Sequence, residues 1–272
     1  PICLVVVIPL WTIFVASFTS DQALGDNGYS LWPQDFTLDS YIYLFTRPEL
    51  LFRSYGVTLF VTAVGTVLSI VCMTMYAYTL TRKSFKLKKF LDYYILIPML
   101  FSGGTVPYYI LVTRGLQLKN TIWILILPLV ISPFYVLLLR TNMKAIPASY
   151  VEAAKIDGAG EFRIFISIIL PLSMAGIATV ALFSMLGYWN DMYQALLFID
   201  EQSLFPLQYL LYKLISDSRV IPQGASFVGQ QVPFRSVKMA MAVMAILPIM
   251  FAFAFVQKYF VKGITLGGIK GD

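Results

Sequence analysis

The chain has 272 residues, of which 58% are hydrophobic and only 12% are charged, with a formal net charge of +6. A soluble domain carries about 25% charged residues, so this composition excludes an ordinary soluble protein and indicates a membrane protein. Histidine is absent, which removes the commonest general base and metal ligand, and we predict neither a catalytic site nor a metal site.

Six apolar segments each approach the length of about 20 residues that a helix needs to cross a bilayer. They cover roughly residues 1–18, 55–80, 90–112, 121–139, 167–198 and 237–260. We therefore predict an all-α membrane protein, with six transmembrane helices in a single domain over residues 1–272. The first segment shows no basic region or cleavage site, so we interpret it as most of a first span and not as a signal peptide. Because the chain begins at Pro1 and not at Met, we expect further residues before it.

Two connecting segments, residues 19–54 and 199–236, are longer than a connection requires. The first contains an amphipathic stretch at 41–52, which is either a contact surface for a soluble partner or a helix lying on the lipid surface. The second contains a helical pattern at 208–215 and a Gly/Pro/Gln-rich end at 222–233. Long ordered loops are often functional, and for the second segment we favour contact with a partner.

Two of the predicted spans contain helix breakers. The third is interrupted at residues 102–104, and the fourth contains Pro128 and Pro133. Broken helices are tolerated at membrane depth where neighbouring protein or a water-filled path satisfies the backbone. We interpret the two prolines as packing kinks. The glycine break, which is followed by Tyr108 and Tyr109, is either another kink or part of a substrate pathway.

Basic residues gather in three short segments. They are Arg82, Lys83, Lys86, Lys88 and Lys89 after the second span, Arg140, Lys144, Lys155 and Arg163 after the fourth, and Lys258, Lys262 and Lys270 after the sixth. The positive-inside rule places these segments, and with them both termini, in the cytoplasm. The positive net charge is therefore interpreted as a topology signal beside anionic lipid, and no nucleic acid partner is predicted.

A polar, helix-forming segment lies between the fourth and fifth spans, in a loop of about residues 141–166. Pro147 suits a first helical turn, the following residues favour a helix, and Gly158 can take the left-handed conformation that ends one. We predict a second helix from about Gly160 that enters the membrane through Pro171. A short helix, a glycine turn and a membrane helix would together form a lever at the bilayer surface.

The residues of this loop resemble the signature loop of importer-type ABC permeases. The matching positions are Glu152-Ala153-Ala154, Gly158, Ile168 and Leu170-Pro171, and the longer form that includes Asp157 and Ala159 is similar to the carbohydrate-uptake, maltose-type branch. The resemblance extends along the whole chain, from residues 36–41 to residues 257–263. It implies a cytoplasmic coupling helix whose residues Glu152, Ala153, Ala154, Asp157 and Gly158 dock on an ATPase.

The resemblance implies a pore-forming permease subunit of the bacterial inner membrane that imports an oligosaccharide or another sugar. The implied partners are a second, related permease chain, two copies of a cytoplasmic ATPase, an extracellular or periplasmic solute-binding protein, and membrane lipid. The chain contains no Walker-type Gly-Lys-Ser/Thr sequence, so we expect the ATPase to bind ATP and Mg, and we expect no cofactor in this chain.

Two alternatives remain open. The cargo could be a glycerol phosphate, a polyol or a modified polysaccharide. The chain could also be an ion-coupled secondary transporter, although that class needs a buried ionisable relay and only Asp191 and Asp92 are candidates for one.

The end of the fifth span combines aromatic and polar side chains. Aromatic faces beside amide groups suit sugars, so we predict that Trp189, Asn190 and Tyr193, with Tyr108 and Tyr109, line the substrate pathway. Asn190 and Tyr193 are three residues apart and would share a helix face, whereas Asp191 is expected to bond a neighbouring helix or loop. The alternative is an interfacial aromatic belt. The Trp189-Asn190-Asp191 run also resembles an element of the maltose-type branch, in which either pore subunit can hold most of the sugar contacts.

Overall fold

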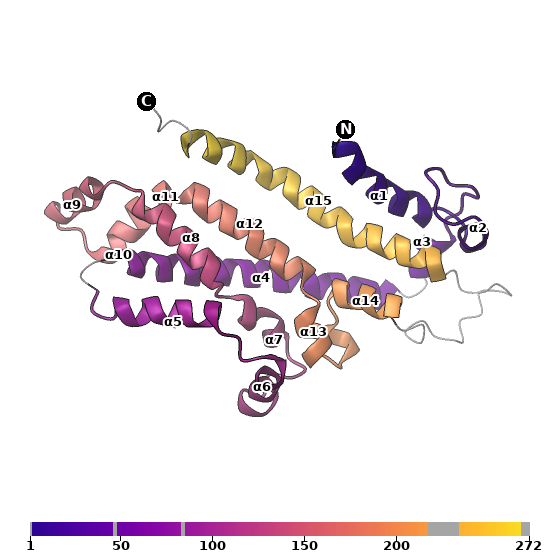
Figure 1. The fold of residues 1–272 in the computed structure, drawn as a ribbon, viewed down its shortest axis with the longest axis horizontal. Helices are drawn as coiled ribbons and strands as arrows, with labels where there is room; N and C mark the ends of the chain where they lie inside the picture. Colours follow the sequence, from indigo (N-terminus) through magenta and orange to yellow (C-terminus); the bar gives the residue numbers. More distant parts are fainter. Residues whose placement is uncertain (1, 46–47, 83–84, 217–233, 268–272) are drawn as a thin grey trace. The chain divides into compact units, whose positions relative to one another are not determined.

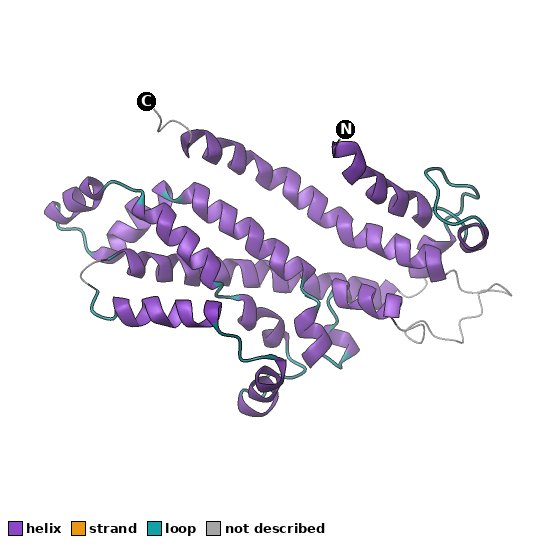
Figure 2. Cartoon of the chain, viewed as in Figure 1, coloured by secondary structure: helices purple, strands orange, loops and turns teal. Residues whose placement is uncertain are grey.

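The computed structural model describes residues 2–45, 48–82, 85–216 and 234–267 (Figure 1). Regular structure in these residues is helical, apart from an isolated β-bridge between Thr19 and Phe36 (Figure 2). The predicted all-α class is confirmed. The α-helices are α1 (Ile2–Ser17), α2 (Asp21–Asp26), α3 (Asp39–Leu44), α4 (Pro48–Thr81), α5 (Lys88–Leu100), α6 (Thr105–Ile110), α7 (Ile122–Ile126), α8 (Pro133–Lys144), α9 (Ala148–Ile156), α10 (Glu161–Ile164), α11 (Leu170–Leu172), α12 (Met174–Asn190), α13 (Tyr193–Phe198), α14 (Leu207–Ser216) and α15 (Phe234–Gly267).

Short π-helical and 3-10 segments connect several of these α-helices. Two are π-helical, η1 (Leu111–Gly115) and η3 (Phe165–Ile169), and two are 3-10 helices, η2 (Leu127–Leu129) and η4 (Gln202–Leu204). The chain divides into two compact units, which we describe separately: the first from residues 1–59 and 191–252, the second from residues 60–190 and 253–272. That residues 1–272 act as one permease domain remains a prediction.

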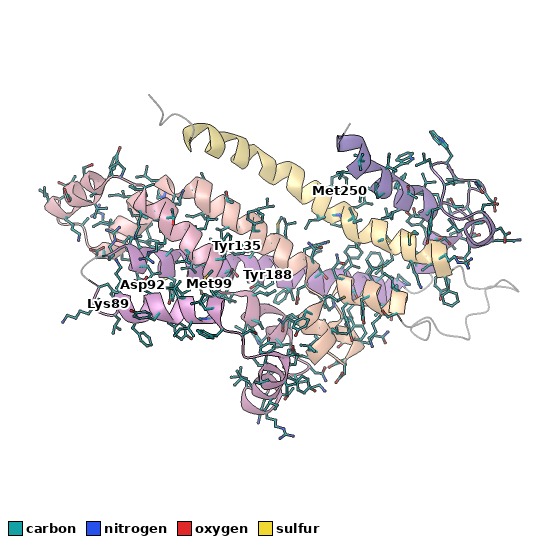
Figure 3. All side chains as sticks on the ribbon, in the orientation of Figure 1. Lys89, Asp92, Met99, Tyr135, Tyr188 and Met250 are labelled. Atoms are coloured by element: carbon teal, nitrogen blue, oxygen red, sulfur yellow. The ribbon has the colours of Figure 1, made fainter. Side chains whose placement is uncertain are left out.

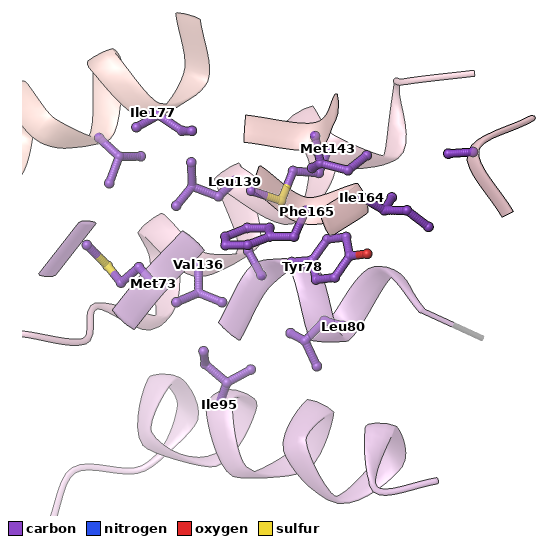
Figure 4. Packing of buried hydrophobic residues seen from close by; sticks show 14 residues of the cluster. Met73, Tyr78, Leu80, Ile95, Val136, Leu139, Met143, Ile164, Phe165 and Ile177 are labelled. Carbon is purple, nitrogen blue, oxygen red and sulfur yellow. The ribbon is translucent and has the colours of Figure 1, made fainter. Parts of the chain in front are cut away.

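The second unit is a helical bundle in which α8 packs against both α5 and α12. The later part of α4 runs along these helices (Figure 1). A buried apolar cluster joins α4, α5, α8, the α10–η3 segment and α12 (Figure 4). Its members include Met73, Tyr78, Leu80, Ile95, Val136, Leu139, Met143, Ile164, Phe165, Ile169 and Ile177. Ala154 of α9 also belongs to this cluster, so the short helix is packed on the bundle.

Three helix pairs that are apolar enough for one span are strongly bent. The bend is 119° between Lys88–Leu100 and Thr105–Gly115, 46° between Ile122–Leu129 and Pro133–Lys144, and 80° between Glu161–Leu172 and Met174–Asn190. The first two were anticipated from the breakers: Gly104 has a φ of +82°, and Ser132 is extended before Pro133. The third was not. Ser173, with φ −95° and ψ 6°, ends the three-residue α11, so the helix predicted to continue through Pro171 turns there.

Two described helices, α4 and α15, are long and apolar enough on their own to cross a bilayer, and counting each bent pair as one span gives up to five. Among the described residues, Val5–Ser17 of α1 is a further, shorter apolar helix. The range 167–198, predicted as one span, is divided into α11, α12 and α13. Six spans therefore remain a prediction.

The first unit is held together by hydrogen bonds between segments that are distant in the sequence. The Tyr55 hydroxyl donates to the Met244 carbonyl at 2.5 Å, and the Thr58 hydroxyl accepts from the Leu207 amide at 2.8 Å. The Asp21 carboxylate accepts from the Ser236 amide at 3.2 Å, where a negative charge suits the N-terminus of α15. The helical pattern predicted at 208–215 is confirmed by α14. Residues 217–233, including the Gly/Pro/Gln-rich end at 222–233 of the predicted partner-contact segment, lie outside the described residues.

Candidate functional site

The predicted coupling segment forms a short helix, α9, preceded by Pro147 and ended at Asp157. Gly158 then takes a left-handed φ of +78°. The Ala159 amide donates to the Ala154 carbonyl at 2.9 Å, and the Gly158 amide donates to the Lys155 carbonyl at 3.1 Å. This pair of hydrogen bonds is the Schellman arrangement, in which a left-handed residue satisfies the last carbonyls of a helix. The helix, its end point and the glycine conformation were all predicted correctly.

One side of α9 is packed and the other is open. Ala154 faces the buried cluster, whereas Glu152, Ala153, Asp157 and Gly158 are exposed. The five residues predicted to dock thus divide into one that anchors the helix to its own bundle and four on its accessible surface.

Large apolar side chains extend this accessible surface. Ile156 is 86% exposed and Phe162 on α10 is 69% exposed, and Tyr150 is also exposed. Exposed apolar groups of this size in a polar loop are typical of a protein contact surface. The sequence analysis missed them. The signal was present, because Tyr150, Ile156 and Phe162 are large apolar residues interspersed among the polar residues of a loop predicted to face water.

Polar contacts connect α9 to the long helix α4. The Lys155 ammonium lies 2.8 Å from Glu161 Oε1, and the Tyr78 hydroxyl donates to Glu161 Oε2 at 2.6 Å. The Arg82 guanidinium lies 4.4 Å above the Tyr78 ring. Because Lys155 and Glu161 are half exposed, their ion pair contributes at most about 1 kcal/mol. The ion pair mainly fixes the position of α9, since Glu161 contacts Lys155 of α9 through one oxygen and Tyr78 of α4 through the other.

Basic residues lie at the start of α5, as Lys88 and Lys89, and at the end of α8, as Lys144. An ion pair between Arg140 of α8 and Asp92 of α5, 2.8 Å apart, holds the cytoplasmic ends predicted for these helices together. Figure 3 shows Asp92 beside Lys89 in the first turn of α5. Asp92 is therefore part of a charge pair in this structure and not an isolated carboxylate at membrane depth.

The predicted pathway residues at the end of α12 are not on one helix. The α-helix ends at Asn190 and α13 begins at Tyr193, and the boundary between the two units lies between them. The spacing argument that gave Asn190 and Tyr193 a common face is therefore wrong. Asp191 lies between the two helices, and its Oδ1 accepts from the Tyr193 amide at 3.2 Å, which is an Asx turn into the neighbouring helix α13.

Exposure differs among these residues. Trp189 is only 4% exposed, whereas Asn190 and Tyr193 are exposed. The Asn190 amide nitrogen donates to the Leu186 carbonyl at 2.9 Å, within its own helix. Tyr108 and Tyr109 lie on α6, after the sharp bend, with Tyr109 exposed and Tyr108 half-buried.

Sequence reasoning missed the structural role of Tyr188. Its ring is buried, and its hydroxyl lies 3.0 Å from Ser69 Oγ on α4 and donates to the Ile126 carbonyl on α7 at 3.0 Å. Figure 3 shows the side chain inside the bundle, beside α4. A β-carbon added at Gly65 would stand 2.5 Å from the Tyr188 ring. Tyr188 therefore fixes the end of α12, directly before the predicted pathway residues.

The chain was compared with known proteins. Residues 65–266 match the family described as binding-protein-dependent transport system inner membrane component. Protein LplC of Bacillus subtilis is 38% identical over 98% of this chain and 90% of its own length. The polygalacturonan/rhamnogalacturonan transport system permease protein YtcP of the same species is 36% identical, over 98% of this chain and 94% of its own.

A third relative and a solved structure also belong to sugar transport systems. The arabinooligosaccharides transport system permease protein AraQ of Halalkalibacterium halodurans is 32% identical over 99% of this chain and 93% of its own. A chain from a bacterial ABC transporter involved in the import of the acidic polysaccharide alginate superposes with a TM-score of 0.85, at 27% identity, over 95% of this chain and 92% of its own. The chain thus belongs to the binding-protein-dependent transport system inner membrane components, and it is a multi-pass ABC importer permease of the bacterial inner membrane, not itself an enzyme.

Proposed function

We propose that this permease imports an oligosaccharide or a modified polysaccharide fragment. A solute-binding protein would deliver this cargo, and the permease would form the pore with a second, related chain. Two copies of a cytoplasmic ATPase, which bind ATP and Mg, would drive transport. In this proposal the end of the bundle that carries α9, and both chain termini, lie in the cytoplasm.

The proposed coupling role rests on the accessible surface of the α9–Gly158–α10 element and on its contacts with the bundle. Its accessible surface combines Glu152, Ala153 and Asp157 with the exposed apolar side chains of Ile156 and Phe162. A short helix that presents a few apolar anchors with a polar rim fits a groove on a protein partner. Ala154 and Glu161 tie the same element to the bundle, so a movement of the ATPase would be passed to α4 and α10.

The cargo class rests on the relatives. YtcP is named for polygalacturonan and rhamnogalacturonan and AraQ for arabinooligosaccharides, and the superposed transporter is described as involved in the import of alginate. These names favour oligomeric sugars over glycerol phosphate or polyols. Both a neutral and an acidic sugar chain occur among them, so both belong in the test.

The test is ATPase stimulation of the purified complex, reconstituted in lipid with its binding protein. We expect stimulation by one class of sugar oligomer among arabino-, galacturono- and alginate oligosaccharides. Glycerol phosphate and polyols should leave ATP hydrolysis at its basal rate. Stimulation by either of these small solutes, with no response to any oligosaccharide, would contradict the proposed cargo and leave the coupling role intact.

The pathway residues are tested one at a time, because Asn190 and Tyr193 lie in different units. We propose that both contact the cargo and that the buried Trp189 supports Asn190 from within α12, with Tyr108 and Tyr109 as further contacts. Removing a stacking ring or a hydrogen-bonding amide costs about 1–3 kcal/mol, which corresponds to roughly 5- to 150-fold in apparent affinity. Asn190→Ala and Tyr193→Ala should therefore reduce uptake, with complex assembly and basal ATPase activity unchanged.

The matched control is Tyr94→Ala on α5, another exposed tyrosine, which lies outside the proposed pathway. It should transport like the wild type. Wild-type uptake by both Asn190→Ala and Tyr193→Ala would assign this region to an interfacial aromatic belt instead.

A further inference from the structure

We propose that residues 27–36 form a membrane anchor, in which Trp32, with Tyr29 and Leu31, inserts into the interfacial layer of the bilayer beside α1. The proposal depends on the membrane location of the chain and not on which cargo it carries. It concerns a contact with lipid headgroups and the adjoining acyl chains, and it assigns the exposed aromatic residues of this loop to lipid and not to the binding protein.

The base of the loop is closed by a short ladder of backbone contacts. The Ser20 amide donates to the Asp35 carbonyl at 3.0 Å, and the Thr37 amide donates to the Phe18 carbonyl at 2.9 Å. Between them Thr19 and Phe36 form an isolated antiparallel bridge. A loop whose ends meet in this way has a defined conformation of its own. Its side chains are therefore held in definite positions relative to α1.

The middle of the loop folds back along α1. The Trp11 indole nitrogen donates to the Leu31 carbonyl at 3.0 Å, and the Trp11 and Trp32 rings meet edge to face with their centroids 6.3 Å apart. The Phe18 and Phe36 rings stack at 5.7 Å. Trp11 lies six residues before the end of α1 at Ser17, which is about 9 Å along the helix axis. Leu31 and Trp32 therefore lie beside the last turns of α1.

The exposed surface of α1 and that of the loop are continuous and apolar. On α1 the exposed residues include Val7, Leu10 and Phe14, which a membrane helix presents to lipid. Trp32 is 74% exposed, and Tyr29 and Leu31 are exposed as well. Residues 27–34 contain no charged side chain. Insertion of Tyr29, Leu31 and Trp32 would thus remove apolar surface from water without burying a charge, while the exposed Asp35 stays hydrated at the base of the loop.

Tryptophan and tyrosine are suited to the interfacial layer of the bilayer. Trp and Tyr are enriched where the bilayer meets water, since their rings are apolar and their N–H or O–H groups can remain hydrated. Trp32 contacts a residue of the predicted span itself, which places its ring at the level of lipid. A site for the binding protein would have to present its aromatic residues beyond the end of α1.

Nitroxide labelling of the complete complex in lipid bilayers tests the proposal. Trp32→Cys and Asp26→Cys are made in a background with Cys3→Ser and Cys72→Ser, and the label's collision rates with oxygen and with a water-soluble nickel chelate are compared. The unsubstituted background supplies the signal of any partner cysteines. Asp26 is an exposed acidic residue at the end of α2 and serves as the matched aqueous control.

We expect the ratio of oxygen to chelate collisions to be severalfold higher at position 32 than at position 26. Tyr29→Cys provides a second reporter if Trp32→Cys reduces assembly, and it should behave like position 32. Equal chelate access at positions 29, 32 and 26 would overturn the proposal. If added binding protein then shielded position 32, the loop would be a protein contact and not a lipid anchor.

Discussion

Gly158→Val should abolish the stimulation of ATP hydrolysis by cargo-loaded binding protein while leaving the permease in the membrane. Gly158 has a φ of +78° and no atom within 4 Å of the position that a β-carbon would occupy. The penalty is therefore conformational and not steric against a neighbour. An ordinary residue pays roughly 1–2 kcal/mol in the left-handed region, and a β-branched side chain is a strong outlier there.

The expected consequence is loss of the turn between α9 and α10. If residue 158 leaves the left-handed region, the hydrogen bonds from Gly158 to Lys155 and from Ala159 to Ala154 cannot both form. The accessible surface around Ile156 would then lose its fixed relation to Glu161 and α4. Docking or force transmission should fail, although the buried cluster, to which Gly158 contributes no side chain, stays intact.

Two variants separate this explanation from general damage to the loop. Gly158→Asn should keep most of the coupling, because Asn tolerates the left-handed conformation better than other residues with a side chain. Gly160→Ala should behave like the wild type, since Gly160 has an ordinary φ of −70° and nothing within 4 Å of its added β-carbon. Wild-type stimulation in Gly158→Val would refute the proposed role of the turn.

Sequence signals were sufficient where the structure is decided locally. Pro147, the helix formers after it and Gly158 lie within one short segment, and the helix they predicted ends at the expected residue. The glycine and proline breaks at Gly104 and Pro133 are local in the same sense, and both are present. Hydrophobicity alone was also enough to predict an all-helical membrane protein.

Sequence signals failed where contacts or turns overrode a continuous apolar pattern. Residues 167–189 are largely apolar, so their hydrophobicity did not mark the bend at Ser173, and the predicted span continued past the break after Asn190. Asp191 supplied a signal for that break, since an Asp two residues before a helix commonly accepts one of its amides. We interpreted it by helical spacing instead. Tyr188 and its partner Gly65 could not have been paired from the sequence, because no local pattern connects them.

The close contact between Gly65 and Tyr188 leads to a second prediction with a large expected effect. Gly65→Ala should lower the thermal stability of the purified permease and its yield in the membrane. An added β-carbon would lie 2.5 Å from Tyr188 Cζ, 2.6 Å from Cε1 and 2.8 Å from Cε2. The ring cannot easily move aside, because it is buried and its hydroxyl is held by Ser69 and the Ile126 carbonyl. Overpacking of this kind costs about 1–3 kcal/mol.

Gly56→Ala is the matched control on the same helix, since a β-carbon at Gly56 meets nothing within 4 Å. It should unfold at or slightly above the wild-type temperature, because alanine favours a helix over glycine by about 0.5–1 kcal/mol. An equal loss of stability in both variants would mean that α4 tolerates no alanine, whatever its neighbours, and would contradict the packing argument.

A double variant identifies the clash itself. Tyr188→Leu removes the ring atoms nearest Gly65 at the expense of the two hydroxyl contacts, so Gly65→Ala should be less damaging in that background than in the wild type. Tyr188 directly precedes Trp189 and Asn190, so displacement of its ring also moves the end of α12. Gly65→Ala should therefore reduce uptake beyond its effect on yield, measured per assembled complex, whereas Gly56→Ala should not. Full uptake per complex in Gly65→Ala would separate the packing of α12 from the proposed cargo contact at Asn190.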